Sequence, residues 1–472
     1  MRLMPDAVAA PQPALPSARP LLAPFYRGWP LIGVAYSMRV DPLGTMERAF
    51  AETGGAEAVF IKLGPYQATL LRHPDLIRRV FVENASNYSK MTRGYAKSKI
   101  VLGQGLVTSE GELWQRQRRI ANPAFHRSRV HGFGQTFVRA TSDMLDGWHG
   151  RADASASVDV FTELMRCTLR IAAETLLGVR ADAELDSLAK TVSLVLERTN
   201  DIITNPLSPP IGVPTYKNVT FKRAIRRLDQ FVYAAIEQRR RTPDPASTDL
   251  LSILMAAQDD EQGTGGMSDK QLRDEAVTIL IAGHETVANA LSWTLHLLGQ
   301  HPAYWDELAA EARAVAGDRA PTIDDLPNLK LTRAVIDEGM RLYPPAWMIG
   351  RAATEADVVG GYRIDKGTFV LVSPYMTHRH PGLWQNAAAF DPARFLPGGE
   401  AERLPKFSYL PFGGGPRFCI GSTFALVEAT LVLATIARRC SLAPDPAGPA
   451  VEPYAMITLR PRNGIRVTPR WR

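Results

Sequence analysis

Residues 268–298 constrain the fold of this chain more than any other segment, because they form one long apolar segment without proline. The pattern predicts a single helix of about 30 residues, roughly 45 Å long at about 1.5 Å per residue. A helix this long and this apolar has to be covered by other elements on most of its surface. The sequence therefore predicts a fold that is organised around one central helix.

Five consecutive residues of this segment, Ala282, Gly283, His284, Glu285 and Thr286, are unusual in a buried helix. Glycine costs about 1 kcal/mol in a helix interior, and a threonine hydroxyl can bond to a carbonyl one turn earlier. A charged glutamate among apolar residues also needs a partner. The residues alone leave two interpretations open: a tolerated imperfection on a partly exposed helix, or a kinked helix with a groove that admits a small ligand.

The composition is that of a globular protein, with 472 residues, of which 45% are hydrophobic and 22% charged. A chain of this length can bury a large core and still enclose a ligand cavity. Lys and Arg number 55 against 48 for Asp and Glu, a net charge of +7. This mild excess favours an acidic protein partner over nucleic acid. No apolar stretch approaches the ~18–20 residues of a membrane-spanning helix, so we expect no membrane anchor.

The N-terminal segment is rich in proline and lacks the apolar core of a signal peptide. We expect an extended arm over residues 1–25, followed by a single domain over residues 26–472. The three cysteines, Cys167, Cys419 and Cys440, are too far apart to indicate a disulfide framework or a cysteine-based zinc site. A reducing compartment fits best, and we expect a cytoplasmic enzyme.

The remaining pattern predicts a mainly α fold with a minor β portion. The expected helices cover residues 42–53, 73–83, most of 111–200, 219–257, 326–343 and 422–437. The expected strands are a hairpin of residues 59–63 and 68–71, and short pieces at 356–364, 368–372 and 455–467. Residues 202–216 hold four prolines among apolar residues, which disfavours a helix and is common in lids over binding sites.

The strongest chemical signal lies at residues 412–421, where Gly413, Gly414 and Gly415 precede Cys419. Glycines let the backbone turn tightly and aim N–H groups at the sulfur, which stabilises a thiolate and tunes a metal bound to it. A helix is predicted to start after Gly421, and the position before a helix N-terminus favours an anion. A lone thiolate in an apolar loop, with no second cysteine or histidine nearby, suits an axial ligand to haem iron.

This segment resembles the haem loop of the cytochrome P450 family, F-x-x-G-x-R-x-C-x-G, through Phe412, Gly415, Arg417, Cys419 and Gly421. The resemblance covers nearly the whole chain. It implies the cytochrome P450 fold, mainly α with small β-sheets and with haem b between the long central helix and the Cys-bearing loop. It makes Cys419 the iron ligand and places Phe412, Arg417 and Gly421 at the cofactor.

Residues 282–286 match the family's [AG]-G-x-[DE]-T motif on the helix across the distal face of the haem. The resemblance makes Gly283 the groove for dioxygen. It makes Glu285 and Thr286 the acid–alcohol pair that delivers protons to bound oxygen. His284 fills a variable position, and we interpret it as non-ligating.

Other matches concern the haem propionates and the scaffold. Trp114 and Arg118 fit W-x-x-x-R, whose spacing puts both on one helical face. By resemblance these two residues meet a propionate, as do Arg351 and Arg417, because a guanidinium forms charge-assisted bonds with a carboxylate. A further group, Glu338, Arg341 and Arg394, resembles the family's structural lock, and we assign His378 no ligand role.

The resemblance implies a monooxygenase that inserts one atom of O2 into a lipophilic substrate by hydroxylation or epoxidation. Electrons would come from NAD(P)H through a reductase and a separate ferredoxin or flavodoxin, and we expect a monomer. Arg116 and Arg119 could form the docking face for that acidic protein, or only a solvated basic face. Two alternatives, a peroxide-using or isomerising haem-thiolate enzyme and a non-catalytic haem sensor, would not need the acid–alcohol pair.

The substrate pocket is predicted from apolar content and family position. Its candidate residues suggest a fatty acid, a terpenoid or a steroid, and the sequence does not distinguish among these classes. The candidates are Met91, Ile279, Ala282, Ala346, Trp347, Met348, Ile349, Met456 and Ile457.

Overall fold

The computed structural model describes residues 21–151, 153, 156–180, 184–205, 207–243, 249–256 and 266–472. Within these ranges the α-helices are α1 (Ala35–Val40), α2 (Pro42–Glu52), α3 (Pro74–Arg78), α4 (Arg93–Leu102), α5 (Gly111–Ala121), α6 (Arg127–His131), α7 (Gly134–His149), α8 (Val160–Leu176), α9 (Leu185–Thr204), α10 (Tyr216–Arg241), α11 (Leu250–Ala256), α12 (Asp269–Gln300), α13 (Ala303–Ala316), α14 (Lys330–Leu342), α15 (Pro374–Thr377) and α16 (Ser422–Arg439). The strands are β1 (Ala58–Leu63), β2 (Tyr66–Leu71), β3 (Tyr88–Ser89), β4 (Val158–Asp159), β5 (Ile349–Ala353), β6 (Asp357–Val359), β7 (Tyr362–Ile364), β8 (Phe369–Val372), β9 (Cys440–Pro444), β10 (Pro453–Ala455), β11 (Leu459–Pro461) and β12 (Arg466–Trp471).

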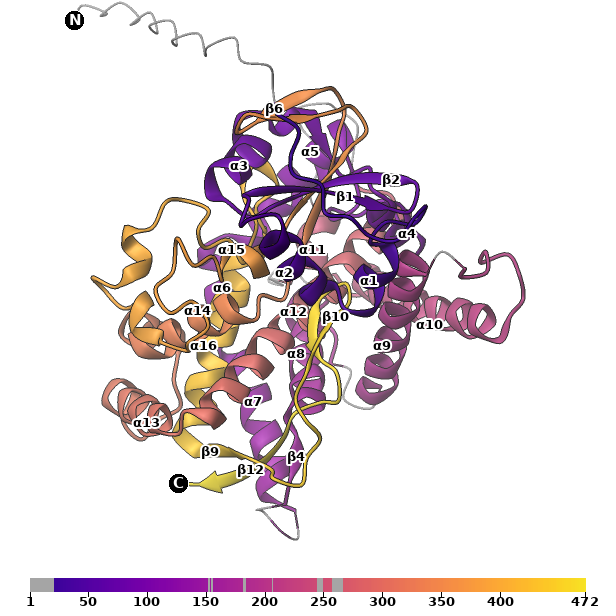
Figure 1. Ribbon diagram of the computed structural model, residues 1–472. Coiled ribbons are helices and arrows are strands. Elements are labelled where there is room, and N and C mark those ends of the chain that lie inside the picture. Colours follow the sequence, from indigo (N-terminus) through magenta and orange to yellow (C-terminus); the bar gives the residue numbers. More distant parts are fainter. Residues whose placement is uncertain are drawn as a thin grey trace, which may run out of the picture.

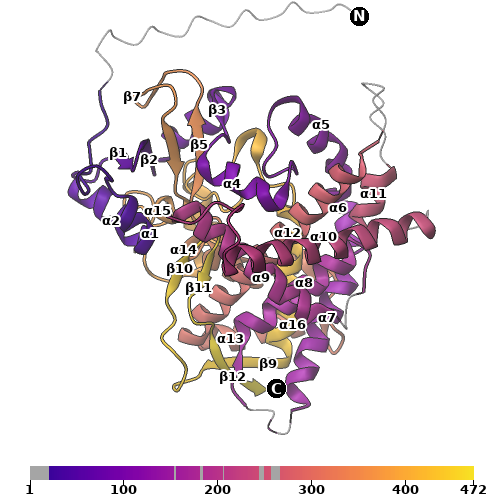
Figure 2. The same ribbon diagram turned by 90° about the vertical axis from the view of Figure 1, so that its right-hand side faces the viewer.

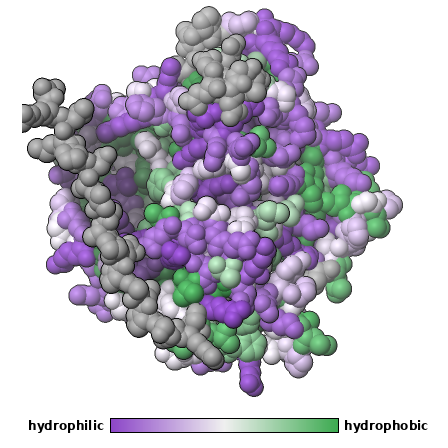
Figure 3. Space-filling view, turned by 90° about the horizontal axis from the view of Figure 1, so that it is seen from above, coloured by the Kyte–Doolittle hydropathy of each residue, from purple (hydrophilic) through white to green (hydrophobic). Residues whose placement is uncertain are grey.

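Helices form the body of the molecule, and the main sheet lies at one side of it (Figure 1). In the view turned by 90°, β1 and β2 lie with α1 and α2 on the left, while α5, α6, α7 and α11 lie on the right (Figure 2). Seen from above, the surface is mostly hydrophilic, with separate hydrophobic patches between the polar side chains (Figure 3). Among the described residues, no helix combines the length and the apolarity needed to cross a bilayer.

The central helix is confirmed as α12, which runs from Asp269 to Gln300 and packs against α8, α10, α14 and α16. A capping box starts it, because the Ser268 hydroxyl accepts the N–H of Gln271 and the Gln271 side chain accepts the N–H of Ser268. Most of its residues are buried, including polar ones. The apolar pattern of the sequence therefore identified the helix at the centre of the core.

The main sheet has the strand order β1-β2-β8-β5-β3. β1 and β2 form the predicted antiparallel hairpin, with Leu63 opposite Tyr66, and β2 then pairs with β8 in parallel. β5 returns antiparallel to β8, although no strand was predicted at its position. The remaining strands form a three-stranded sheet, β4-β12-β9, and two hairpins, β6-β7 and β10-β11.

Several predicted boundaries are wrong, and proline explains two of them. The helix expected over residues 219–257 ends as α10 at Arg241, close to Pro243, and α11 starts separately at Leu250. The helix expected over residues 326–343 is a 3-10 segment, Ile323–Asn328, that contains Pro327, followed by α14. The strand expected over residues 455–467 consists of parts of β10, β11 and β12.

Other segments follow the sequence more closely. The proline-rich connection expected over residues 202–216 begins in the last turn of α9 and ends at the first residue of α10, and its described residues between Thr204 and Tyr216 contain no helix. Of the predicted arm over residues 1–25, residues 1–20 lie outside the described part of the chain. Leu21 and Phe25 form single β-bridges with Tyr362 and Phe60, so the segment that follows is attached to the strands.

Candidate active site

The Cys419 loop contains glycines at two positions where the backbone is left-handed. Gly413 and Gly415 have φ angles of 71° and 65°, in the left-handed region. A Cβ atom on Gly415 would lie 1.7 Å from the backbone oxygen of Phe81, so the loop can approach that segment only with glycine there. The N–H of Cys419 donates to the carbonyl of Phe412 at 3.0 Å, and α16 begins at Ser422. The loop therefore presents Cys419 just before a helix, as predicted.

Opposing influences act on the Cys419 thiol. The residue keeps solvent-accessible surface, but protein atoms crowd around the sulfur, and this desolvation raises the pKa of Cys419. The backbone N–H of Gly421 and the positive charges of Arg118 and Lys90 lower the pKa of Cys419. These three groups stabilise the thiolate, which is the form that binds a metal.

Four basic side chains converge beside this loop: Lys90, Arg118, Arg351 and Arg417. Burial lowers the pKa of Lys90 to about 7, and the charges of Arg417, Arg351 and Arg118 act in the same direction. Burial is also the main cause that lowers the pKa of Arg417 to about 10, with the charges of Arg351 and Arg118 contributing. Such mutual repulsion marks a site that is built to receive anions.

The cluster contains too little negative charge of its own. Arg417 pairs with Glu110 at 2.8 Å, donates to the Ser109 carbonyl at 3.0 Å and stacks 3.8 Å above the Trp114 ring. The carboxylate of Glu110 offsets one of the four positive charges. Two propionates of a haem would supply the missing anions, so the residues present fit that cofactor.

Lys90 has no counterpart among the sequence predictions. It follows the two-residue strand β3, and its Nζ donates to the Val107 carbonyl at 2.8 Å. A single lysine in a short polar segment carries no periodicity or motif, so only its position in space shows that it belongs with Arg351 and Arg417.

The unusual part of α12 combines buried and accessible positions. Ala282 is exposed and Thr286 is half-buried, whereas His284 and Glu285 are buried. The Thr286 hydroxyl donates to the Ala282 carbonyl at 2.7 Å, the bond to the preceding turn that the sequence predicts. A Cβ atom on Gly283 would lie 3.2 Å from Leu176, so glycine here lets α12 approach α8 closely.

Glu285 finds the partners that its burial demands on β11 and the turn before it. Thr458 donates to Oε1 of Glu285 at 2.7 Å, and Nη2 of Arg460 lies 3.2 Å from the same oxygen. The neighbouring His284 uses its Nδ1 toward the Leu280 carbonyl at 3.0 Å, and burial is the main cause that lowers the pKa of His284.

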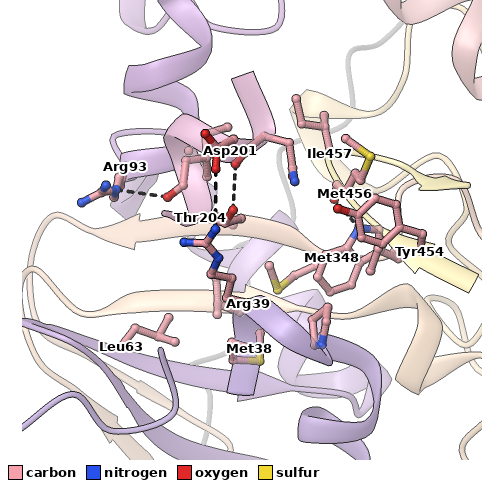
Figure 4. Close-up of a pocket in the computed structure, with 18 of the residues that line it drawn as sticks. Met38, Arg39, Leu63, Arg93, Asp201, Thr204, Met348, Tyr454, Met456 and Ile457 are labelled. Carbon is pink, nitrogen blue, oxygen red and sulfur yellow. Dashed lines mark hydrogen bonds and ion pairs between the residues drawn. The ribbon is translucent and has the colours of Figure 1, made fainter. Parts of the chain in front are cut away.

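A cavity of about 1000 Å³ opens between α9, the first strands and the β10–β11 hairpin. Figure 4 shows Arg93, Asp201 and Thr204 on one side of it, and Met348, Met456 and Ile457 on the other. Four of the nine predicted pocket residues line it: Trp347, Met348, Met456 and Ile457. The other five, Met91, Ile279, Ala282, Ala346 and Ile349, are not among its lining residues.

The structure shows where two of these five residues, Met91 and Ile349, lie instead. Met91 is 77% exposed, which does not suit an enclosed apolar pocket. Ile349 starts β5, and its Cδ1 would lie 3.5 Å from a Cβ atom on Gly413, so it packs against the Cys419 loop.

The predicted structural lock is fully buried. Arg341 donates to both oxygens of Glu338 at 2.6 and 2.7 Å and to the carbonyls of His378, Ala387 and Ala389. Nε of Arg394 lies 3.5 Å from Glu338. Nε2 of His378 accepts the N–H of Leu410 at 2.9 Å, and burial lowers the pKa of His378 to about 3. His378 therefore connects the lock to the segment that leads into the Cys419 loop.

Comparisons with known proteins show the family of this chain. The family model "Cytochrome P450" matches residues 24–468. Cyclooctatin synthase from Streptomyces melanosporofaciens is 37% identical over 451 residues, which is 95% of each chain. Cyclooctat-9-en-7-ol 5-monooxygenase from the same organism is 34% identical over 88% of each chain, and pentalenene oxygenase from Streptomyces avermitilis is 33% identical over 93% of this chain and 96% of its own. With the family model covering almost its entire length, the chain belongs to the cytochrome P450 family.

Proposed function

We propose that this cytochrome P450 monooxygenase hydroxylates a cyclic terpenoid. The names of its relatives favour the terpenoid among the three lipophilic classes that the sequence suggests, since one relative oxygenates pentalenene and another cyclooctat-9-en-7-ol. The cavity supports this proposal, because about 1000 Å³ with an apolar wall of Trp347, Met348, Met456 and Ile457 accommodates a compact polycyclic skeleton.

The observation that carries the haem assignment is the group of four basic side chains beside the Cys419 loop. Haem supplies the iron chemistry that activates dioxygen and transfers one oxygen atom to the substrate. We assign Cys419 as its thiolate ligand, with the N–H of Gly421 stabilising the negative sulfur. Lys90, Arg118 and Arg351 would neutralise the propionates together with Arg417, which Trp114 holds in place by stacking.

Thr286 and Glu285 are our candidates for proton handling. The Thr286 hydroxyl donates to Ala282, so its oxygen lone pairs stay available to accept a hydrogen bond from a bound molecule. Glu285 is the adjacent carboxyl group, but its oxygen is tied to Thr458 and Arg460 and has to turn before it can serve Thr286. Gly283 and the residues around the loop, Phe412 and Gly421, complete the proposed cofactor site.

Electrons have to come from a redox partner, and we propose a ferredoxin or flavodoxin with its reductase, acting on a monomer. α5 supports this proposal, because Arg119 is exposed and Arg116 half-buried on the helix that also carries Trp114 and Arg118. Positive charge at the rim of a docking face attracts an acidic protein and raises the association rate.

Reconstitution tests the proposed function. The purified holoprotein is given a ferredoxin, its reductase, NADPH and the terpene alcohol cedrol, and products are identified by mass spectrometry. We expect a product with one added oxygen atom that disappears without the reductase and in Cys419→Ala, whose carbon monoxide complex should lose the red-shifted band of a haem-thiolate. Turnover of cedrol with hydrogen peroxide alone, or binding without turnover, would instead favour the peroxide-using enzyme or the haem sensor.

A further inference from the structure

Arg460 on β11 connects the cavity to the buried Glu285. Its Nη2 lies 3.2 Å from Oε1 of Glu285, and its Nη1 lies 3.6 Å from Oε1 of Glu197 on α9. Arg460 and Glu197 both line the cavity, whereas Glu285 is not among the lining residues. One guanidinium therefore contacts a carboxylate inside the protein and another at the cavity wall.

One carboxylate oxygen of Glu285 is held in place by two groups of the protein. Only 3% of its side chain is exposed, and Thr458 donates to the same oxygen that Arg460 contacts. Thr458 is itself fixed by the Asn289 amide, which donates to its hydroxyl at 3.0 Å. These contacts hold Glu285 against the turn before β11 and β11 itself. Because a carboxyl group moves a proton only to atoms within hydrogen-bond reach, Glu285 has to turn before it can serve Thr286.

Arg460 is held much less firmly than a purely structural arginine of the same protein. Arg341 is completely buried, and its guanidinium donates to both Glu338 oxygens and to three carbonyls. Arg460 has ion pairs at 3.2 and 3.6 Å, and its buried Nε has no hydrogen-bond partner among the described residues. Because buried donors are normally satisfied, this guanidinium has capacity for a further acceptor.

The two carboxylates around Arg460 also differ in environment. The Glu197 side chain is 62% exposed, while Glu285 is almost entirely buried. A small displacement of the guanidinium toward the cavity shortens its distance to Glu197 and lengthens its distance to Glu285. A ligand oxygen in the cavity would favour that displacement, since it offers a second acceptor on the same side.

We propose that Arg460 is a positioning residue that makes proton supply depend on an oxygen-bearing ligand in the cavity. A hydroxyl or carbonyl oxygen of the ligand draws Arg460 toward Glu197 and releases Glu285 to turn toward Thr286. The substrate is then a terpenoid that already carries an oxygen atom, so an earlier oxygenation or a water-capturing cyclisation must supply it. This inference rests on the proposed function, which assigns the proton relay to Glu285.

Infrared spectroscopy tests the contact without turnover. Arg460→Met leaves the buried Glu285 without its cation, and burial favours the neutral acid. We expect the difference spectrum between Arg460→Met and the Arg460→Met/Glu285→Gln double variant to contain a protonated carboxyl band. The corresponding difference between wild type and Glu285→Gln should lack it, and so should Arg460→Lys, which keeps the charge. Arg462→Met is the matched control, because Arg462 lines the same cavity but pairs with Glu452.

The ligand arm uses wild-type protein, so it stands even where Arg460→Met does not fold. Cedrol and its parent hydrocarbon cedrane are added in turn, and the bands assigned to Glu285 by comparison with Glu285→Gln are recorded. We expect cedrol to shift these bands and cedrane to leave them unchanged. In Glu197→Gln, which removes the exposed negative charge that pairs with Arg460, the shift should need about two- to five-fold more cedrol, the range expected from losing an exposed ion pair.

Turnover supplies an independent readout. In Arg460→Met, which removes the cation that holds Glu285, NADPH consumption without substrate should rise relative to consumption with cedrol, whereas a merely structural defect would lower both rates together. Identical Glu285 bands with cedrol, with cedrane and in the Arg460 variants would overturn the inference, even if cedrol is hydroxylated normally. Absence of any oxygenated product, with the ligand-dependent bands intact, would instead refute the proposed function and leave the role of Arg460 standing.

Discussion

Glu275 on α12 should make the stability of this protein depend on pH near neutrality. Its side chain is completely buried; Oε2 accepts the N–H of Leu106 at 3.0 Å, and Oε1 has no partner within the described part of the chain. Burial is the main cause that raises the pKa of Glu275 to about 7 from an ordinary 4.5, and the charge of Asp274 adds to it. The hydrogen bond from Leu106 opposes the shift.

Proton linkage gives the direction in which the free energy of unfolding changes with pH. The pKa of Glu275 is higher in the folded protein, so the folded state binds more protons between the ordinary value of 4.5 and about 7. The free energy of unfolding therefore decreases as pH rises through this window. The rise of the pKa of Glu275 from 4.5 to about 7, at about 1.4 kcal/mol per pKa unit, corresponds to roughly 3.5 kcal/mol. Glu275→Gln keeps an acceptor oxygen for Leu106, remains neutral and should abolish this loss.

Thermal unfolding of the holoprotein measures the effect. An unfolding entropy of about 2 cal/mol/K per residue makes roughly 1 kcal/mol equivalent to about 1 °C in Tm for a chain of this length. We expect the Tm advantage of Glu275→Gln over wild type to grow by about 2–3 °C between about pH 5 and about pH 8. The exposed Glu112→Gln is the control and should show no such trend. A Tm difference between Glu275→Gln and wild type that stays constant with pH would refute the reasoning.

Three further predictions concern the site and its scaffold. Thr286→Ala should leave the affinity for cedrol nearly unchanged in an optical titration but divert reducing equivalents to hydrogen peroxide. If the Thr286 hydroxyl handles protons, the yield of oxygenated product per NADPH should fall by about 10²-fold or more, and an unchanged yield would assign proton handling to another residue. Arg341→Met should lower the free energy of unfolding by about 3–5 kcal/mol in urea titrations, because Glu338 loses its buried cation and the surrounding carbonyls lose their donors; a change below about 1 kcal/mol would contradict the lock. Reversing Arg116 and Arg119 to glutamate should slow reduction of the haem at low salt and flatten the salt dependence of that rate, since salt screens such charges over about 8 Å. An unchanged rate would contradict the docking role of these two residues.

Local patterns of the sequence were sufficient to predict the scaffold of the site. The apolar run of α12, the glycines before Cys419 and the i,i+3 spacing of Glu338 and Arg341 all express short-range geometry, which a sequence displays directly. The bond from Thr286 to the preceding turn belongs to the same class, because donor and acceptor lie on one helix. These features needed no knowledge of which distant segments meet.

The tertiary structure alone decided the partners of the site. Lys90 joins Arg351 and Arg417 because β3 and β5 pair in the main sheet and bring residues far apart in the chain to one place. The same holds for Arg460, which reaches Glu285 because the β10–β11 hairpin packs against α12. Charge and hydrogen-bonding capacity can be read from the sequence, but which groups satisfy one another depends on long-range packing, and no periodicity along the chain encodes it.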